Sequence, residues 1–168
     1  MKNSQIIILL FIAALVACKK RKPASPGLSP NSSSDASGDY SLADKFCKDH
    51  GGLTETFKAV DGSAIRACVF GRARIEIISL LNAKQSQAST RFFSPLVSEG
   101  SGATSGANPA SINCEKNGGQ GKSALDEDGE FSFCSFSDGS MIDEWTLFRG
   151  PNDIENAKLK AALEAARK

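Results

Sequence analysis

Two stretches of this chain share one order of apolar and polar positions, and each predicts the same elements. Residues 41–51 and 109–117 have the pattern of short helices. A pair of glycines lies at the C-terminal end of each, Gly51-Gly52 and Gly118-Gly119, and can terminate the helix. The second helix begins with Asn108 and Pro109, because Asn is a good N-cap and Pro suits the first helical position. After each helix come two strand-like segments joined by Asp-Gly, which favours a β-hairpin.

The return strand of the second hairpin, EFSFCSF, is apolar on both of its faces. Phe131 and Phe133 share one face, while Cys134 and Phe136 share the other. We therefore expect this strand to be central in its sheet and covered on both sides.

The segment SDGSMIDEWTLFRGP, which follows, favours a helix of one or two turns, with an edge strand as the alternative. Ser140 and Asp143 have the spacing of a capping box, although Asp is a weaker partner there than Glu. Ile142 and Trp145 recur at helical spacing. The tail, 151–168, has good helix propensity but a thin apolar stripe, so we expect a C-terminal helix that packs weakly.

Four landmarks recur in the same order in the two stretches. Cys47 and Cys114 each precede a Gly-Gly pair by the same spacing, and Asp-Gly follows each cysteine after fourteen residues. A second cysteine comes next, Cys68 after 21 residues and Cys134 after 20, with a phenylalanine two residues further on. The pattern predicts an α+β fold built from two degenerate tandem repeats. In each repeat a short helix would be disulfide-linked to a β-hairpin, and the second would be followed by a short helix or strand.

The N-terminus has the pattern of a bacterial export signal. Lys2 precedes a run of twelve apolar residues, 6–17, which is too short to span a bilayer but suits a signal-peptide core. The next residues, LVAC, resemble the lipobox of bacterial lipoproteins, and this resemblance implies that Cys18 becomes the lipid-modified first residue. An ordinary secretory signal is the alternative. Lys19, by resemblance to enterobacterial sorting, favours the outer membrane, so we expect a lipid-anchored protein of the cell envelope.

Composition divides the chain into six segments and excludes one class of partner. The first thirty residues hold five basic and no acidic side chains, which leaves 15 basic against 19 acidic in the remainder. A folded part that is net negative argues against binding nucleic acid. Stretches rich in Pro, Ser, Gly and Ala predict disordered connections. The expected organisation is signal peptide 1–17, lipidated tether 18–39, first repeat 40–82, flexible linker 83–107, second repeat 108–150 and C-terminal helix 151–168.

The cysteine count supports disulfides rather than a metal site. Five cysteines minus the lipidated Cys18 leave an even number in an oxidising compartment. Of the three possible pairings, the repeat favours Cys47–Cys68 and Cys114–Cys134. Closing loops of this length stabilises each unit by about 3 kcal/mol. No pair of cysteines has zinc-ligand spacing and the one histidine stands alone, so we expect no metal or other cofactor.

The second stretch resembles a bacterial family of small secreted and lipoprotein domains of unknown function, often labelled haemolysins. The resemblance covers residues 108–150 and rests on a set of shared positions: Asn108, Pro109, Ala110, Cys114, Gly118, Gly119, Cys134, Asp138, Gly139, Glu144, Trp145 and Phe148. Family members carry two further cysteines, near Ile142 and just after FRG, that are absent here. The haemolysin label implies little, because this chain has no amphipathic pore-forming segment.

Candidate chemistry in the sequence is sparse. The stretch GGQGKS lacks the first glycine of a phosphate-binding loop, and no serine or cysteine nucleophile is placed by a motif beside His50. The cluster Asp143, Glu144, Trp145 and Arg149 is a possible binding surface, with Trp145 in the core and surface charges as the structural alternative. We expect a non-enzymatic binding module whose partner is an envelope or extracellular protein. The alternatives are an envelope hydrolase that uses His50, and a membrane-damaging, haemolysin-like effector.

Overall fold

The computed structural model describes residues 40–96, 106 and 108–168, all of which fall in one compact unit, Asp35–Lys168. The expected signal peptide, Cys18 and the tether lie outside the described residues. The first half contains these elements in chain order: α1 (Ser41–Asp49), β1 (Leu53–Ala59), β2 (Ala64–Phe70), β3 (Ala73–Glu76), α2 (Ile77–Leu81) and α3 (Gln87–Phe93). The second half contains these: α4 (Pro109–Lys116), β4 (Gln120–Asp126), β5 (Gly129–Ser135), β6 (Met141–Asp143), α5 (Glu144–Arg149), the 3-10 turn η1 (Ile154–Asn156) and α6 (Ala157–Ala166).

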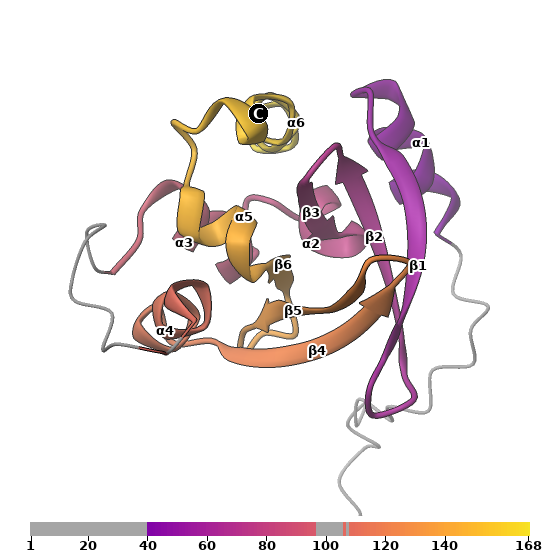
Figure 1. The fold of residues 1–168 in the computed structure, drawn as a ribbon. Coiled ribbons are helices and arrows are strands. Elements are labelled where there is room, and N and C mark those ends of the chain that lie inside the picture. Colours follow the sequence, from indigo (N-terminus) through magenta and orange to yellow (C-terminus); the bar gives the residue numbers. More distant parts are fainter. Residues whose placement is uncertain (1–39, 97–105, 107) are drawn as a thin grey trace, which may run out of the picture. The chain divides into compact units, whose positions relative to one another are not determined.

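The six strands close into one barrel in the order β1-β2-β3-β6-β5-β4 (Figure 1). Within each half the strands form antiparallel meanders, and the Asp-Gly hairpins β1–β2 and β4–β5 are confirmed. The halves meet at two antiparallel junctions. At one, Ile75 pairs with Ile142, and at the other, Lys58 pairs with Leu125. Each half therefore supplies three strands, and the other half closes its ladder.

The register divides the apolar side chains between the two faces of the barrel. Residues that are directly opposite in the ladder share a face, so Phe57, Ile65 and Ala67 lie together on one side. They belong to a buried cluster with Ala124 and Phe133. This face is the interior, because the disulfides attach helices to the other face and helices do not fit inside a six-stranded barrel.

The second buried cluster lies outside the barrel, under the helices. It joins all four cysteines to Ile75 and Ile142, and it includes residues of α2, α3, α5 and α6. The strand expected to be central, β5, lies between β4 and β6 with apolar residues on both faces, which confirms that expectation.

Both expected disulfides are present. Cys47 is bonded to Cys68 and Cys114 to Cys134, so each ties the helix that opens its half to the return strand of its hairpin. The helix starts also follow the sequence: the Asn108 side chain accepts a hydrogen bond from the Ala110 amide at 3.0 Å, with Pro109 in the first turn.

The two glycines after each of these helices have different roles. Gly51 and Gly118 have positive φ angles of 78° and 84°, which end α1 and α4. Gly52 and Gly119 instead lie against the disulfides, where a Cβ atom would collide with a sulfur of Cys68 or Cys134. The first glycine of each pair is needed for backbone geometry, and the second for space.

The structure differs from the expectation at three places. The expected flexible linker, 83–107, contains helix α3 with Ala88 and Phe92 buried. The short helix expected after β5 is present as α5, but strand β6 precedes it, and Asp143 rather than Ser140 is its N-cap. The C-terminal helix does not pack weakly, because its apolar residues are fully buried: Leu159, Ala162 and Leu163.

The junction between β3 and β6 carries two matching hydrogen bonds between the halves. The Arg74 amide donates to Thr146 Oγ1 at 3.1 Å, and the Met141 amide donates to Ser79 Oγ at 2.9 Å. The two bonds correspond to each other at an interval of 67 residues, since the donor Met141 stands 67 positions after the donor Arg74 and the acceptor Thr146 stands 67 positions after the acceptor Ser79. The same interval separates the paired residues Ile75 and Ile142.

Candidate functional site

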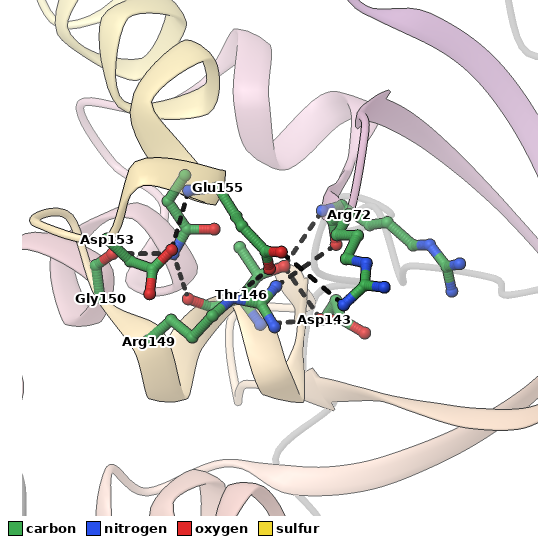
Figure 2. Close-up of polar contacts among 9 residues, drawn as sticks. Arg72, Asp143, Thr146, Arg149, Gly150, Asp153 and Glu155 are labelled. Carbon is green, nitrogen blue, oxygen red and sulfur yellow. Dashed lines mark hydrogen bonds and ion pairs between the residues drawn. The ribbon is translucent and has the colours of Figure 1, made fainter.

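Two residues of the cluster that the sequence singled out, Asp143 and Arg149, lie at the two ends of α5 (Figure 2). Asp143 is buried and caps this helix by accepting hydrogen bonds from the Thr146 amide at 2.7 Å and the Thr146 hydroxyl at 2.9 Å. Behind them, Asn156 donates to the carbonyl oxygens of Thr146 and Gly150 at 2.9 Å and 2.7 Å. This part of the cluster holds α5 against the turn that leads to α6, so its contacts are structural.

Charged side chains extend this network toward solvent. The Glu155 carboxylate forms ion pairs with Arg149 at 3.4 Å and with Arg72 at 3.7 Å (Figure 2). One carboxylate thus joins two arginines from different halves of the chain. The Arg72 side chain is 80% exposed, and such a pair contributes little to stability in water.

The four residues of the expected binding surface do not share one face. Asp143 and Glu144 are buried, and Glu144 accepts a hydrogen bond from the Ser111 hydroxyl at 2.6 Å, which joins α5 to α4. Trp145 is 42% exposed, so it is not a core residue, and its ring packs edge-to-face on Phe148. The expectation of one exposed cluster is therefore wrong for the two carboxylates, because helix capping and helix packing use them.

Burial raises the pKa of Glu144, and the hydrogen bond from Ser111 offsets only part of this effect. Because the folded protein then binds this proton more tightly than the unfolded chain, the associated stability is present at low pH. It is lost as pH rises through the raised pKa.

Replacing Glu144 with Gln is therefore expected to raise the thermal unfolding midpoint at pH 7 and to leave it unchanged below about pH 4. An amide oxygen can still accept from Ser111, and no charge is buried. Thermal denaturation followed by circular dichroism across this pH range measures the difference. The exposed Glu127→Gln variant is the matched control, and an equal gain in both variants would contradict the explanation.

His50, the residue of the hydrolase alternative, is placed as a helix end. It follows α1 as the C-cap residue, its Nδ1 lies 2.8 Å from the Phe46 carbonyl oxygen, and its ring stacks on the Phe46 ring. Because a carbonyl oxygen can only accept, Nδ1 is the donor in this bond. This arrangement resembles a structural histidine at a helix terminus.

A cleft of about 480 Å³ opens at the end of the barrel where β2 begins and β3 ends. Its walls come from both halves, and its lining includes apolar and polar side chains: Tyr40, Ile65, Arg66, Glu76, Ile78, Ser79, Asn82, Gln85, Ser86, Asp138, Ser140 and Met141. None of these residues was a candidate from the sequence. No local motif marks them, because they meet only when β6 is placed beside β3.

Two hydroxyl–carboxylate pairs line this cleft. Ser79 donates to Glu76 and Ser140 donates to Asp138, both at 2.6 Å. Each hydroxyl oxygen also accepts a backbone N–H at 2.9 Å, from Met141 onto Ser79 and from Ala88 onto Ser140. Both serines therefore hold the walls of the cleft together.

The charges around the cleft are of both signs. Arg66 is engaged by Asp44 through two hydrogen bonds of 2.9 Å and 2.6 Å, so that pair is neutral. Burial raises the pKa of Glu76 despite hydrogen bonds from Ser79 and Ile78. Partial burial also acts on Asp138, but hydrogen bonds from Ser140 and from the Gln87 amide outweigh it and lower its pKa. Among the described residues, no arginine or lysine forms an ion pair with either of these two carboxylates, Glu76 and Asp138.

Two further properties concern the described part of the chain only. Within residues 40–96, 106 and 108–168, no group of three or more His, Cys, Asp or Glu side chains could hold a metal ion. No helix in these ranges is long and apolar enough to cross a membrane.

The described residues form a six-stranded barrel with external helices, two disulfides and an open cleft at one end. A family model described as a domain of unknown function, DUF333, matches residues 105–151. The match spans the second half from α4 to α5, so this half is similar to a family without an established function. No curated protein and no solved structure matches the chain.

Proposed function

We propose that this chain is a non-enzymatic binding module, lipid-anchored through Cys18 in the bacterial cell envelope. The observation that carries the binding role is the cleft at the mouth of the barrel, whose rim offers side chains that are free to contact a ligand. Asn82 and Gln85 are exposed there, and within the described residues their side chains form no hydrogen bond. Ser79 and Ser140 already have structural partners on both sides of the hydroxyl, and the Ser86 hydroxyl accepts from the Ser89 amide as the N-cap of α3, which favours binding over nucleophilic catalysis.

Site-specific crosslinking in intact cells tests the binding role. A photoreactive benzoylphenylalanine at Gln85, on the rim, should yield a discrete adduct with an envelope or extracellular protein. The same residue at Glu127, in the exposed β4–β5 turn away from the cleft, is the matched control. Identical adducts from both positions, or none from the rim, would contradict a binding role for the cleft.

The lipid anchor rests on the lipobox resemblance and has its own test. Replacing Cys18 with Ser is expected to move the protein from the membrane fraction to the soluble fraction, because the acyl chains that hold it would be missing. The released protein should keep the circular dichroism spectrum of the anchored form. A Cys18→Ser variant that sediments with membranes in the same proportion as the parent would rule out this anchor.

We further propose that the two halves are degenerate copies of one α-β-β-β-α unit. The order of elements, the two disulfides and the interval of 67 residues between paired positions at both junctions support this origin. In this view a unit with two open strand edges closes only against another copy. The sequences of the linked copies then diverged. The cleft lies beside Glu76 of the first half, and the corresponding residue of the second half, Asp143, does not line it.

A further inference from the structure

Glu76 and Asp143 occupy corresponding places in the two halves. Each carboxylate is the N-cap of the helix that follows the third strand, and each accepts from the amide and the hydroxyl of the residue three positions later. For Glu76 these donors belong to Ser79, and for Asp143 they belong to Thr146. The two sites are therefore built alike up to this point, and they differ in what faces the carboxylate.

The Asp143 site contains its own cations. Burial raises the pKa of Asp143, while the hydrogen bonds from Thr146 and the charges of Arg74 and Arg149 offset part of this effect. Arg74 lies over the ring of Phe131 at 4.2 Å and bonds Asp126 at 2.9 Å, so its guanidinium fills this end of the barrel. The charge of Asp143 is thus offset in part from within the chain.

The Glu76 site has neutral residues at the positions of both cations. The interval of 67 residues gives the corresponding positions. Met141 corresponds to Arg74 of the first half, and Asn82 corresponds to Arg149 of the second half. Both line the cleft. Where one half is filled by arginine side chains, the other half has an open space of about 480 Å³ next to a carboxylate.

The remaining charges around this space leave it net negative. Arg66 is held by Asp44 in a two-point contact, and the rim adds a second carboxylate, Asp138. The carboxylate of Glu76 accepts three hydrogen bonds, from the Ile78 amide, the Ser79 amide and the Ser79 hydroxyl. A carboxylate has about four acceptor sites, so about one is left for a ligand.

We propose that the cleft binds a cationic group, the ammonium or guanidinium of a lysine or arginine side chain on the partner protein. The group would lie beside Glu76 as Arg74 and Arg149 lie near Asp143, with its alkyl stem against Ile65 and Met141. This inference rests on the proposed binding role and adds the chemistry of the ligand to it. The aliphatic floor and the carboxylate suit a side chain that is apolar along its stem and charged at its end.

Methyl NMR of the mature lipoprotein in a non-ionic detergent tests this directly. Of the two methionines in the chain, Met1 lies in the expected signal peptide, so in the mature protein a ¹³C-methyl label reports Met141 in the cleft. n-Butylammonium and methylguanidinium should shift the Met141 signal at constant ionic strength. Their neutral counterparts n-butanol and N-methylurea should bind about tenfold more weakly or worse, because charge-assisted hydrogen bonds are lost.

Two variants with a matched control assign the effect to the cleft. Glu76→Gln should weaken the binding of both cations about tenfold, while the exposed Asp128→Asn should leave it unchanged. Because Glu76 also caps α2, Met141→Arg serves as an independent variant. It places the arginine of the other half in the cleft and should abolish cation binding in a calorimetric titration, with the near-ultraviolet dichroism of Trp145 retained.

Equal affinity for cations and neutral counterparts would overturn the proposal, as would cation binding that survives both Glu76→Gln and Met141→Arg. Either result leaves the rim crosslink at Gln85 as the separate measure of the binding role. If cations bind as expected but Gln85 yields no adduct, the cleft is a cation site, and the proposal that a protein supplies the cation is contradicted. Where Gln85 does yield an adduct, loss of that adduct on adding n-butylammonium supports a partner's side chain as the source of the cation, and an adduct that persists contradicts it.

Discussion

Replacing Gly119 with alanine is expected to destabilise the protein by about 1–3 kcal/mol, the usual cost of forcing extra atoms into a packed core. A Cβ atom at this position would collide with Sγ of Cys134. It would also lie 2.9 Å from Sγ of Cys114 and 3.3 Å from the Phe136 ring. The disulfide is anchored at both ends, in α4 and β5, so it cannot move aside. Chemical denaturation of the oxidised protein measures this loss.

The neighbouring glycine separates this steric cost from a backbone cost. A Cβ at Gly118 would meet nothing within 4 Å, so Gly118→Ala should lose only about 1 kcal/mol through its positive φ angle. In a Cys114→Ala, Cys134→Ala background the collision at Gly119 is gone, and the cost of Gly119→Ala should fall markedly. An unchanged cost in that background would show that the disulfide is not the obstacle.

The second large effect is expected at the junction between the halves. Ile142 is fully buried and pairs with Ile75 of the other half, so Ile142→Ala should cost about 2–5 kcal/mol and Ile142→Val about 0.5–1.5 kcal/mol. The junction belongs to both halves, so the loss should appear as one shifted transition. Trp145 fluorescence reports the second half and far-ultraviolet dichroism reports the whole chain, and the two curves should coincide.

Ile154 provides the matched control for this junction. It is 87% exposed in η1, so Ile154→Ala should change the stability by less than about 0.5 kcal/mol. Two separate transitions in Ile142→Ala, with Trp145 fluorescence unfolding first, would mean that the halves fold independently.

The sequence predicted those parts of the fold that local chemistry determines. Asn108 before Pro109 marks a helix start, and Asp-Gly between apolar strands marks each hairpin, because both signals act within a few residues. The disulfide pairing followed from the recurrence of cysteines and is confirmed. These features do not depend on how the two halves meet.

The strands β3 and β6 could not be predicted in the same way. Each has four residues or fewer and is stabilised by pairing across the junction, with Ile75 opposite Ile142. Ser140 looked like a helix cap from its spacing, but its hydroxyl donates to Asp138, and Asp143 caps α5 instead. The cleft was missed for the same reason, since its lining residues meet only across the barrel.

The expected binding surface was predicted from the types of four neighbouring residues, and residue type does not report burial. Trp145 and Arg149 reach the surface, whereas Asp143 and Glu144 are buried by contacts with Thr146 and Ser111. Helix caps and binding residues use the same side-chain types, so sequence spacing alone does not separate them.

The most direct test of the account is whether the two halves stay together without a covalent link. Neither disulfide joins one half to the other, so a protease site inserted between Gly102 and Ala103 allows the chain to be cut into two pieces. Size-exclusion chromatography of the cut protein in non-denaturing buffer should give one peak that contains both fragments, since each barrel half closes against the other. Elution as two separate folded fragments would contradict the shared barrel, and with it the cleft that both halves line.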